Sequence, residues 1–207
     1  MRPNLFLLLC LSIPLAPAGA ADTRGAVPAG SGWHALATRH DRTRLRDWRK
    51  TWVKALALAK ASGNQARVDA EGPLLQPDAA LSAVTPPAGE YRCRTIKIGA
   101  RRAGMPDLVA YAPVRCRIAA GEAGLSFAVL NGAQRPQGRL FAEGLRRMMF
   151  LGTLQLGDEQ GVMRYSHDEL RDLAGFIERV GERRWRVVLP APHFESDLDV
   201  IELIPKD

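Results

Sequence analysis

Short apolar runs separated by chain-breaking residues fill the sequence after Gly89, and they constrain the fold more than any other feature. The runs are rich in Val, Ile, Phe, Tyr and Leu, and Gly, Pro, Asn or Asp residues interrupt them. They predict strands at 90–98, 108–118, 124–130, 137–142, 146–155, 161–166, 173–181, 184–190 and 197–204. Residues 181–183 fit a tight hairpin between two of these strands.

This succession of short strands, with almost no helical pattern between them, is typical of an antiparallel barrel or sandwich. We expect a small closed barrel, because closure leaves no exposed strand edge, and a β-sandwich is the alternative. Trp185 alternates with Val187 and Leu189 along one predicted strand, which places all three side chains in the core.

The segment before Gly89 has a helical pattern instead. From Thr43 to Ser62, apolar residues recur at three- and four-residue steps, and they are Leu45, Trp48, Trp52, Leu56 and Ala59. We therefore expect an α+β protein in which an N-terminal helical segment, 33–88, packs on an antiparallel β part, 89–207.

The sequence also predicts where this helix begins and ends and how its aromatic face packs. Asp41 or Thr43 can cap its start, and Gly63 suits its end. Trp48 and Trp52 lie four residues apart on the apolar face and are expected to pack against the sheet. A stacking platform for a base or a sugar is the alternative.

The first twenty residues have the pattern of a secretory signal peptide, 1–20. Arg2 is a short positive region, Leu5 to Leu15 is apolar, and the small residues 18–20 suit a cleavage site. Residues 21–32 are small and polar with Gly and Pro, which indicates a flexible linker, and 33–207 is expected to form a single domain. The pattern predicts a mature protein that is periplasmic or secreted.

Cleavage at this site removes Cys10 and leaves Cys93 and Cys116. In an oxidising compartment, two cysteines most simply form one disulfide. They fall on the first two predicted strands, so they can lie on facing strands or at a strand end. By the chain-entropy model, closing the loop between them stabilises the fold by roughly 3 kcal/mol. The spacing is not Cys-x-x-Cys, so a structural bond is expected.

The chain is basic, with 29 Lys and Arg against 22 Asp and Glu and a formal net charge of +7. Such a surface can bind anions, but neither basic stretch, 39–54 or 90–117, is an uninterrupted run, and we expect no nucleic-acid partner. Arg92, Arg94, Arg115 and Arg117 are spaced by two on the predicted strands that carry the cysteines. They either form a site for an anionic ligand or pair across strands with carboxylates.

No recognisable catalytic motif is present, since the sequence lacks His-Glu-x-x-His, Gly-x-Ser-x-Gly and the glycine patterns of nucleotide-binding loops. The best candidate for a metal site is the set His193, Glu195, Asp197 and Asp199, because alternate residues of an extended segment face one way. Imidazole and carboxylate ligands suit zinc, manganese or calcium. The alternative is a polar, solvent-facing rim that leads into the last predicted strand.

Several stretches of the chain resemble one family of secreted bacterial proteins. They are Leu74–Pro77, Gly89–Gly99, Cys116–Ile118, Gln134–Arg135, Phe150–Gly152, Arg184–Pro190 and Glu195–Leu203. The family is uncharacterised and is known only as a domain of unknown function. The resemblance spans nearly all of the mature chain, so it implies a single domain, and it implies no activity.

The expected function follows by exclusion. The sequence has no catalytic motif and few histidines, and its predicted β part carries one disulfide. These features favour an exported envelope protein that is a non-catalytic barrel. We expect it to bind an unknown ligand or protein of the envelope, as a monomer, with no cofactor and without spanning the membrane. The alternative is a hydrolase or metalloenzyme that carries no recognisable motif.

Overall fold

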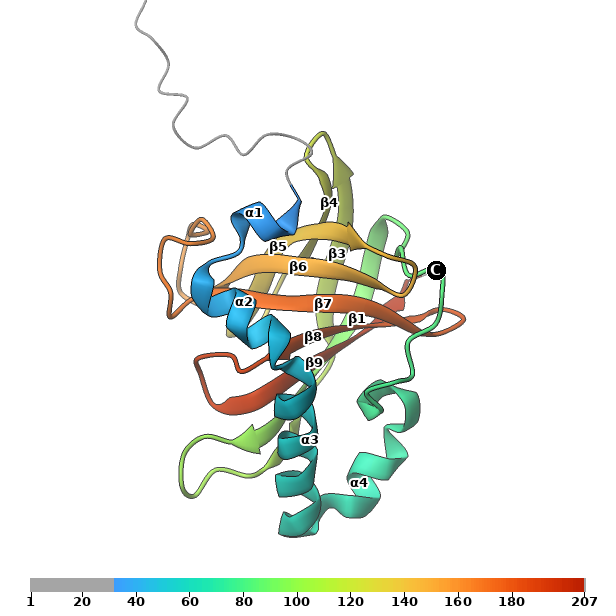
Figure 1. Ribbon diagram of the computed structural model, residues 1–207, viewed down its shortest axis with the longest axis vertical. Coiled ribbons are helices and arrows are strands. Elements are labelled where there is room, and N and C mark those ends of the chain that lie inside the picture. Colours follow the sequence, from blue (N-terminus) through green and yellow to red (C-terminus); the bar gives the residue numbers. More distant parts are fainter. Residues whose placement is uncertain (1–31, 207) are drawn as a thin grey trace, which may run out of the picture.

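Eight antiparallel strands close into a barrel in the computed structural model, which describes residues 32–206 (Figure 1). The strands are β1 (Gly89–Ala100), β3 (Val114–Gly121), β4 (Gly124–Val129), β5 (Gln134–Glu143), β6 (Arg147–Leu156), β7 (Asp172–Gly181), β8 (Arg184–Pro190) and β9 (Ser196–Pro205). Each pairs with the next, and β9 pairs back with β1. The short β2 (Leu108–Ala110) adds to one end of β1. The expected closed barrel is confirmed; the predicted signal peptide and nearly all of the linker lie outside the described residues.

Side chains alternate between the barrel interior and its outer face, because successive residues of a strand point to opposite sides. On β8, Trp185, Val187 and Leu189 belong to the interior apolar cluster, whereas Val188 belongs to the cluster on the outer face. The indole nitrogen of Trp185 donates to the carbonyl of Val84 at 2.8 Å. The prediction that Trp185 and its alternate neighbours lie in the core is therefore confirmed.

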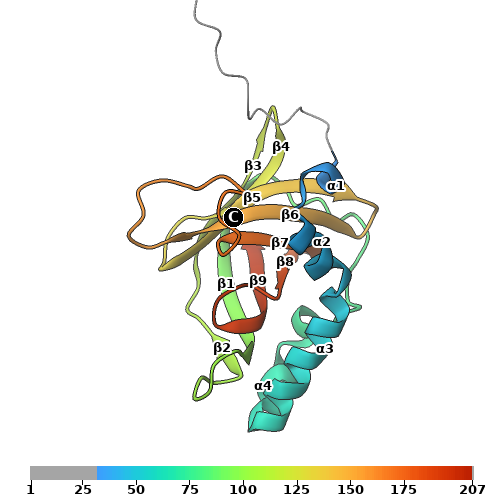
Figure 2. The same ribbon diagram turned by 60° about the vertical axis from the view of Figure 1, so that its left-hand side comes forward.

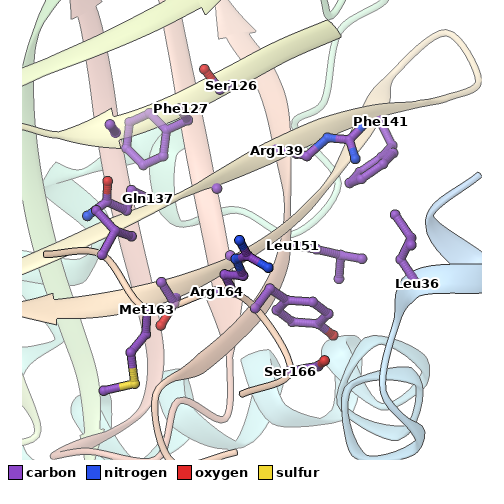
Figure 3. A pocket seen from close by; sticks show the side chains of 16 residues that line it. Leu36, Ser126, Phe127, Gln137, Arg139, Phe141, Leu151, Met163, Arg164 and Ser166 are labelled. Carbon is purple, nitrogen blue, oxygen red and sulfur yellow. The ribbon is translucent and has the colours of Figure 1, made fainter. Parts of the chain in front are cut away.

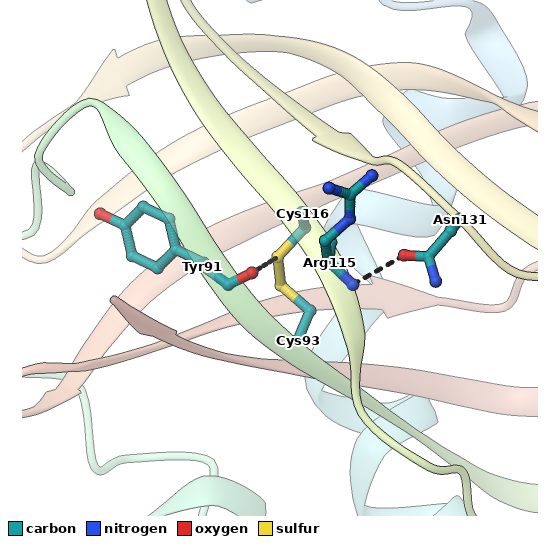
Figure 4. The surroundings of a disulfide bond; sticks show 5 residues. All are labelled: Tyr91, Cys93, Arg115, Cys116 and Asn131. Atoms are coloured by element: carbon teal, nitrogen blue, oxygen red, sulfur yellow. Dashed lines mark hydrogen bonds between the residues drawn. A yellow bond between two sulfur atoms is a disulfide. The ribbon is translucent and has the colours of Figure 1, made fainter. Parts of the chain in front are cut away.

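The disulfide between Cys93 and Cys116 lies in the same interior and joins β1 to β3 (Figure 4). Tyr91 is the register partner of Cys116, and Val114 is the partner of Cys93, so the bond links diagonal neighbours on adjacent strands. Their Cα atoms are 6.0 Å apart, which suits a disulfide. The bond thus connects two neighbouring strands that a loop and the short β2 separate in sequence.

Two glycines allow the barrel wall to coil tightly. Gly138 on β5 and Gly152 on β6 are register partners. A Cβ atom at Gly138 would run into the carbonyl oxygen of Leu151, and one at Gly152 would run into that of Gln137. Strands approach this closely only where a side chain is absent, so bare backbone forms the wall at this point.

The helices cover one side of the barrel (Figure 1 and Figure 2). They are α1 (Trp33–Leu36), α2 (Arg39–Arg46), α3 (Trp48–Ala59) and α4 (Gln65–Ala70), with a π turn at Lys60–Asn64 and a 3-10 turn at Gly72–Leu75. Helix α2 packs on β7, and α3 packs on β1, β8 and β9. The outer faces of β4, β5 and β6 receive no such helical cover beyond the single turn of α1 (Figure 1).

Helix boundaries correct one prediction and confirm another. Neither Asp41 nor Thr43 caps the start: the Thr38 side chain does, accepting a hydrogen bond from the Asp41 amide at 3.1 Å. Sequence periodicity begins only at Leu45, so the polar first turn of α2 gives no apolar signal. The predicted break is right, because Gly63 has a φ of +85° inside the π turn.

Both predicted core tryptophans of the helical segment pack against the barrel. Trp52 is fully buried, and its indole nitrogen donates to the carbonyl of Leu75 at 3.2 Å. Trp48 is half-buried, and its ring centroid lies 5.1 Å from that of Phe176 on β7. The packing prediction is confirmed for both residues.

Two predicted strands differ from the structure. Segment 161–166 belongs to the loop 157–171 between β6 and β7, because β6 pairs directly with β7 and leaves it no strand partner. The predicted strand 108–118 is split into β2 and β3 by residues 111–113, where Pro113 has no amide hydrogen to donate. The first difference matters for function, because this loop covers a pocket.

Candidate functional site

A pocket of about 520 Å³ lies on the outer face of β4, β5 and β6, beneath the loop 157–171 (Figure 3). Helix α1 closes one end of it through Leu36. The lining residues from the strands are Ser126, Phe127, Ala128, Gln137, Gly138, Arg139, Phe141, Leu151, Gly152 and Thr153. Those from the loop are Val162, Met163, Arg164, Tyr165 and Ser166.

Strand alternation builds the floor of the pocket. Phe127 and Leu140 fill the barrel interior, so the residues next to them on β4 and β5 point outward. Between these outward side chains, the bare backbone of Gly138 and Gly152 is part of the floor. The backbone of the glycine pair that lets the wall coil therefore also forms part of the pocket floor.

The loop forms a roof that is tied to the rest of the molecule through Tyr165 and Ser166. The Tyr165 hydroxyl donates to the carboxylate of Asp41 on α2 and accepts from the Thr38 amide at 3.1 Å. The Ser166 amide donates to the carboxylate of Asp172, at the start of β7, at 2.8 Å. Hydrogen bonds to carboxylates are among the stronger ones, so this end of the roof is well anchored.

Apolar side chains form much of the pocket lining. Leu36, Phe141 and Leu151 belong to or pack against the apolar cluster of the outer face. Val162 and Met163 of the roof remain 53% and 39% exposed. Large apolar groups held open to solvent around a concavity are typical of a ligand or partner site.

The charged groups of the lining are all positive. Arg139 and Arg164 line the pocket, and among the described lining residues there is no Asp or Glu. The Arg139 guanidinium donates to the carbonyl of Ala123 at 2.9 Å and lies 4.9 Å from the centre of the Phe141 ring. Its Nε atom is buried without a hydrogen-bond partner.

Two further polar groups of the lining have no partner among the described residues. The Arg164 side chain is exposed and makes no hydrogen bond or ion pair with any of them, and Figure 3 shows its guanidinium over the strands of the floor. Thr153 is only 3% exposed, and its hydroxyl is buried without a partner. Buried polar groups are normally hydrogen-bonded, so these atoms are available to a ligand or to water.

A buried acidic network lies next to the roof. Arg44 pairs with Asp41 and donates to the backbone carbonyl of Asp172 at 2.9 Å. One carboxylate oxygen of Asp172 has no partner, and burial raises the pKa of this carboxyl. Burial likewise favours the neutral hydroxyl and raises the pKa of Tyr165 well above its usual range.

A second group of titratable residues ties the roof to α2 and to the loop between β8 and β9. The His40 ring lies 2.8 Å from the Glu169 carboxylate, and its centroid is 5.2 Å from that of His193. Burial lowers the pKa of His193, and the nearby Arg44 charge acts in the same direction. Neither histidine lines the pocket.

The four predicted metal ligands do not form one site. The Lys97 ammonium lies 3.0 Å from Asp199 and 3.3 Å from Glu195, so a lysine occupies the position between these carboxylates. Asp197 pairs instead with Lys54 at 2.7 Å. In the part of the chain that the structure describes, no group of three or more His, Cys, Asp or Glu side chains is placed to hold a metal ion.

The reason is a break in the strand alternation that the prediction assumed. Strand β9 starts at Ser196, and Glu195 has a φ of +68°, so His193 and Glu195 belong to the preceding loop. His193 turns toward His40 on α2. Local sequence spacing predicts side-chain direction only while the backbone stays extended.

The four predicted anion-binding arginines divide into two pairs. Arg94 pairs with Glu71 and Glu202, and Arg117 pairs with Glu90, its register partner. Cross-strand pairing, the alternative given above, accounts for these two. Arg92 and Arg115 are exposed register partners of each other, and an anion site at them stays a prediction.

Sequence reasoning missed the pocket and its two arginines. Arg139 and Arg164 belong to no motif, and Arg164 lies in a segment that has the pattern of a strand. One usable signal was present: Phe141 and Leu151 are apolar at positions that alternation assigns to the outer face. Apolar residues on a face with little helical cover are the pattern expected of a pocket lining.

The fold and this pocket define a small antiparallel β-barrel with a helical cover on one side and a largely apolar pocket on another. The chain belongs to the family described as domain of unknown function DUF4893, whose family model matches residues 33–203. No curated protein and no solved structure matches the chain. No helix in the described range is long and apolar enough to cross a membrane.

Proposed function

We propose that this protein is an exported, non-catalytic binding protein that holds a small apolar ligand in the pocket beneath the loop 157–171. The observation that carries the proposal is the pocket itself, with a volume of about 520 Å³ and an apolar lining. Sites for small molecules usually have volumes of roughly 300–1,000 Å³ and a few polar groups that orient the ligand.

The chemistry of the lining favours binding over catalysis. Among the described lining residues there is no His, Cys, Lys, Asp or Glu. The nearby Asp172 carboxylate accepts from the Ser166 amide and makes no hydrogen bond with the hydroxyl of Thr153. Nucleophilic catalysis by a hydroxyl requires a general base within hydrogen-bond reach. Buried charged groups elsewhere, such as Lys97 with Asp199, are paired with one another and fit a structural role.

Export is supported by the signal-like pattern of residues 1–20 and by the disulfide between Cys93 and Cys116. We expect cell fractionation to recover the protein outside the cytoplasm. Its intact mass should lack the first ~20 residues, the usual length of a signal peptide. A thiol titration of the unfolded, non-reduced protein should find no free cysteine, and two free thiols would contradict the proposal.

Ligand binding is tested with a neutral, environment-sensitive dye such as Nile red. Fluorescence of the dye should rise on mixing with the protein, and Ala128→Trp should abolish the rise because an indole from the pocket floor fills the space. The matched control is Ala110→Trp on β2, an exposed alanine outside the lining. Equal dye binding by the two variants would reject the pocket as the binding site.

A further inference from the structure

We infer that the ligand of this pocket is an anionic amphiphile, a small molecule with an apolar chain or ring system and one carboxylate. The inference deepens the proposed function and rests on it. Arg139 and Arg164 bind the carboxylate, Thr153 contributes a hydrogen bond, and the apolar lining holds the rest of the molecule.

The positive charge of the pocket lining favours an anionic ligand. Its charged side chains are the two arginines, and no carboxylate accompanies them among the described lining residues. Three outward-facing arginines on another part of the barrel are neutralised by carboxylates: Arg147 and Arg186 share Glu178, and Arg184 pairs with Glu202. Only an anionic ligand complements a lining of this charge.

Hydrogen-bond donors of the lining that have no partner favour a ligand group that only accepts. The Nε atom of Arg139 and the hydroxyl of Thr153 are both buried and have no hydrogen-bond partner among the described residues. Thr153 is 3% exposed and lines the pocket, and its register partner on β7 is Asp172, which also has an unpartnered carboxylate oxygen. A carboxylate is acceptor-only and can take several donors at once, which matches a site that offers N–H and O–H groups.

The apolar surface next to these donors favours a ligand that also has an apolar part. The Phe141 ring, 4.9 Å from the Arg139 guanidinium carbon, places an apolar surface directly beside a cation. Leu36, Leu151, Val162 and Met163 extend that surface. A fully hydrophilic anion, such as inorganic phosphate, would leave this surface in water and gain nothing from it.

The ligand is a free small molecule rather than a membrane surface. The loop 157–171 covers the pocket, and Tyr165 and Ser166 anchor it to α2 and β7. A flat bilayer cannot reach beneath a roof of this kind, whereas a single chain can enter it. Vesicles therefore serve as one arm of the test.

The test is calorimetric titration of the full mature chain with three ten-carbon probes below their micelle concentrations: decanoate, decanol and decyltrimethylammonium. We expect decanoate to bind about 10- to 100-fold more tightly than decanol, the usual gain from charge-assisted hydrogen bonds. The ammonium probe should bind more weakly than decanol. Raised salt should weaken decanoate binding only.

Variants assign the effect to the two arginines. Arg164→Gln and Arg139→Gln should each reduce decanoate affinity by about tenfold while decanol binding is unchanged. Arg102→Gln is the matched control, because Arg102 is an exposed arginine between β1 and β2, outside the lining. Circular dichroism confirms that each variant is folded before titration.

The outcomes of these experiments distinguish the anionic ligand from the apolar binding site itself. Equal binding of decanoate and decanol, with no effect of either arginine variant, overturns the anionic ligand and leaves the apolar binding site standing. Failure of all three probes and of the neutral dye overturns both. Sedimentation with anionic phospholipid vesicles, without binding of free decanoate, would show that the arginines serve a membrane and would overturn the small-molecule inference.

Discussion

Two outer faces of one barrel receive different covers, and the cover decides whether outward polar groups find partners. On the face under α2, α3 and the 3-10 turn, Arg186 and Glu178 are both fully buried and paired at 2.6 Å. Arg186 also donates to the carbonyls of Pro73, Leu74 and Gln76. On the face under the loop 157–171, Arg139 and Arg164 have no carboxylate partner among the described residues, and the buried Thr153 hydroxyl has no hydrogen bond.

The helical segment and the loop 157–171 differ in the hydrogen-bonding groups that they bring to the outward-facing arginines. The 3-10 turn that follows α4 and the residues just after it bring backbone carbonyls to Arg186, since the last carbonyls of a helix can accept further donors. The loop 157–171 directs its carboxylates elsewhere: Glu159 pairs with Arg171, and Glu169 lies beside His40. The polar groups of the helical face are therefore buried and paired, whereas the loop face leaves polar groups without protein partners.

The largest expected effect is on the helical face. Trp52→Ala should lower the free energy of unfolding by about 3–5 kcal/mol, because it removes a fully buried indole and leaves a cavity. Urea unfolding followed by circular dichroism measures the change. Phe141→Ala on the loop face is the control, and its half-buried ring should cost less than Trp52 does. Equal costs would mean that the loop face is packed as tightly as the helical face.

The next largest effect is expected at Arg186, and the loss of stability there is compared with the loss at Arg164. Arg186→Met should cost about 3 kcal/mol, because it leaves a buried Glu178 with Arg147 as its one remaining cation and removes four hydrogen bonds to backbone carbonyls. Arg164→Met should change stability by less than about 0.5 kcal/mol, since the side chain is exposed and makes no contact to lose. The same unfolding assay measures both, and a large loss at Arg164 would argue that it has a structural partner.

The smallest effect is a change in pH dependence at the border between the two faces, where Asp172 contacts both Arg44 and the roof. Burial raises the pKa of this carboxyl above its unfolded value, so the native state holds its proton more readily than the unfolded chain does. The contribution of Asp172 to stability therefore falls as pH rises from the unfolded pKa through the folded one.

Asp172→Asn removes this titration and can keep the hydrogen bond from the Ser166 amide. The variant should gain stability relative to the natural protein as pH rises above about 4, the unfolded pKa of Asp, because the native carboxyl must then ionise while buried. Thermal unfolding at a series of pH values checks this. A stability difference that does not change with pH would show that Asp172 is not the group that titrates.

The sequence alone determined the class of fold and much of the core. Two-residue alternation marks Trp185 and its neighbours as interior, and three- and four-residue steps place Trp52 against the sheet. The cysteine count after the predicted cleavage predicts the disulfide that joins β1 to β3. These are local signals, because the period of a strand or helix is set by the backbone of that segment itself.

Only the tertiary structure decided which groups meet. Barrel closure and strand register bring Lys97 between Glu195 and Asp199, where sequence spacing predicted a metal, and give Arg94 and Arg117 their carboxylates. The same closure leaves segment 161–166 without a strand partner, so its apolar residues cover the outer face of β4 to β6 and create the pocket. Pairing depends on residues far apart in the chain, and no local periodicity records it.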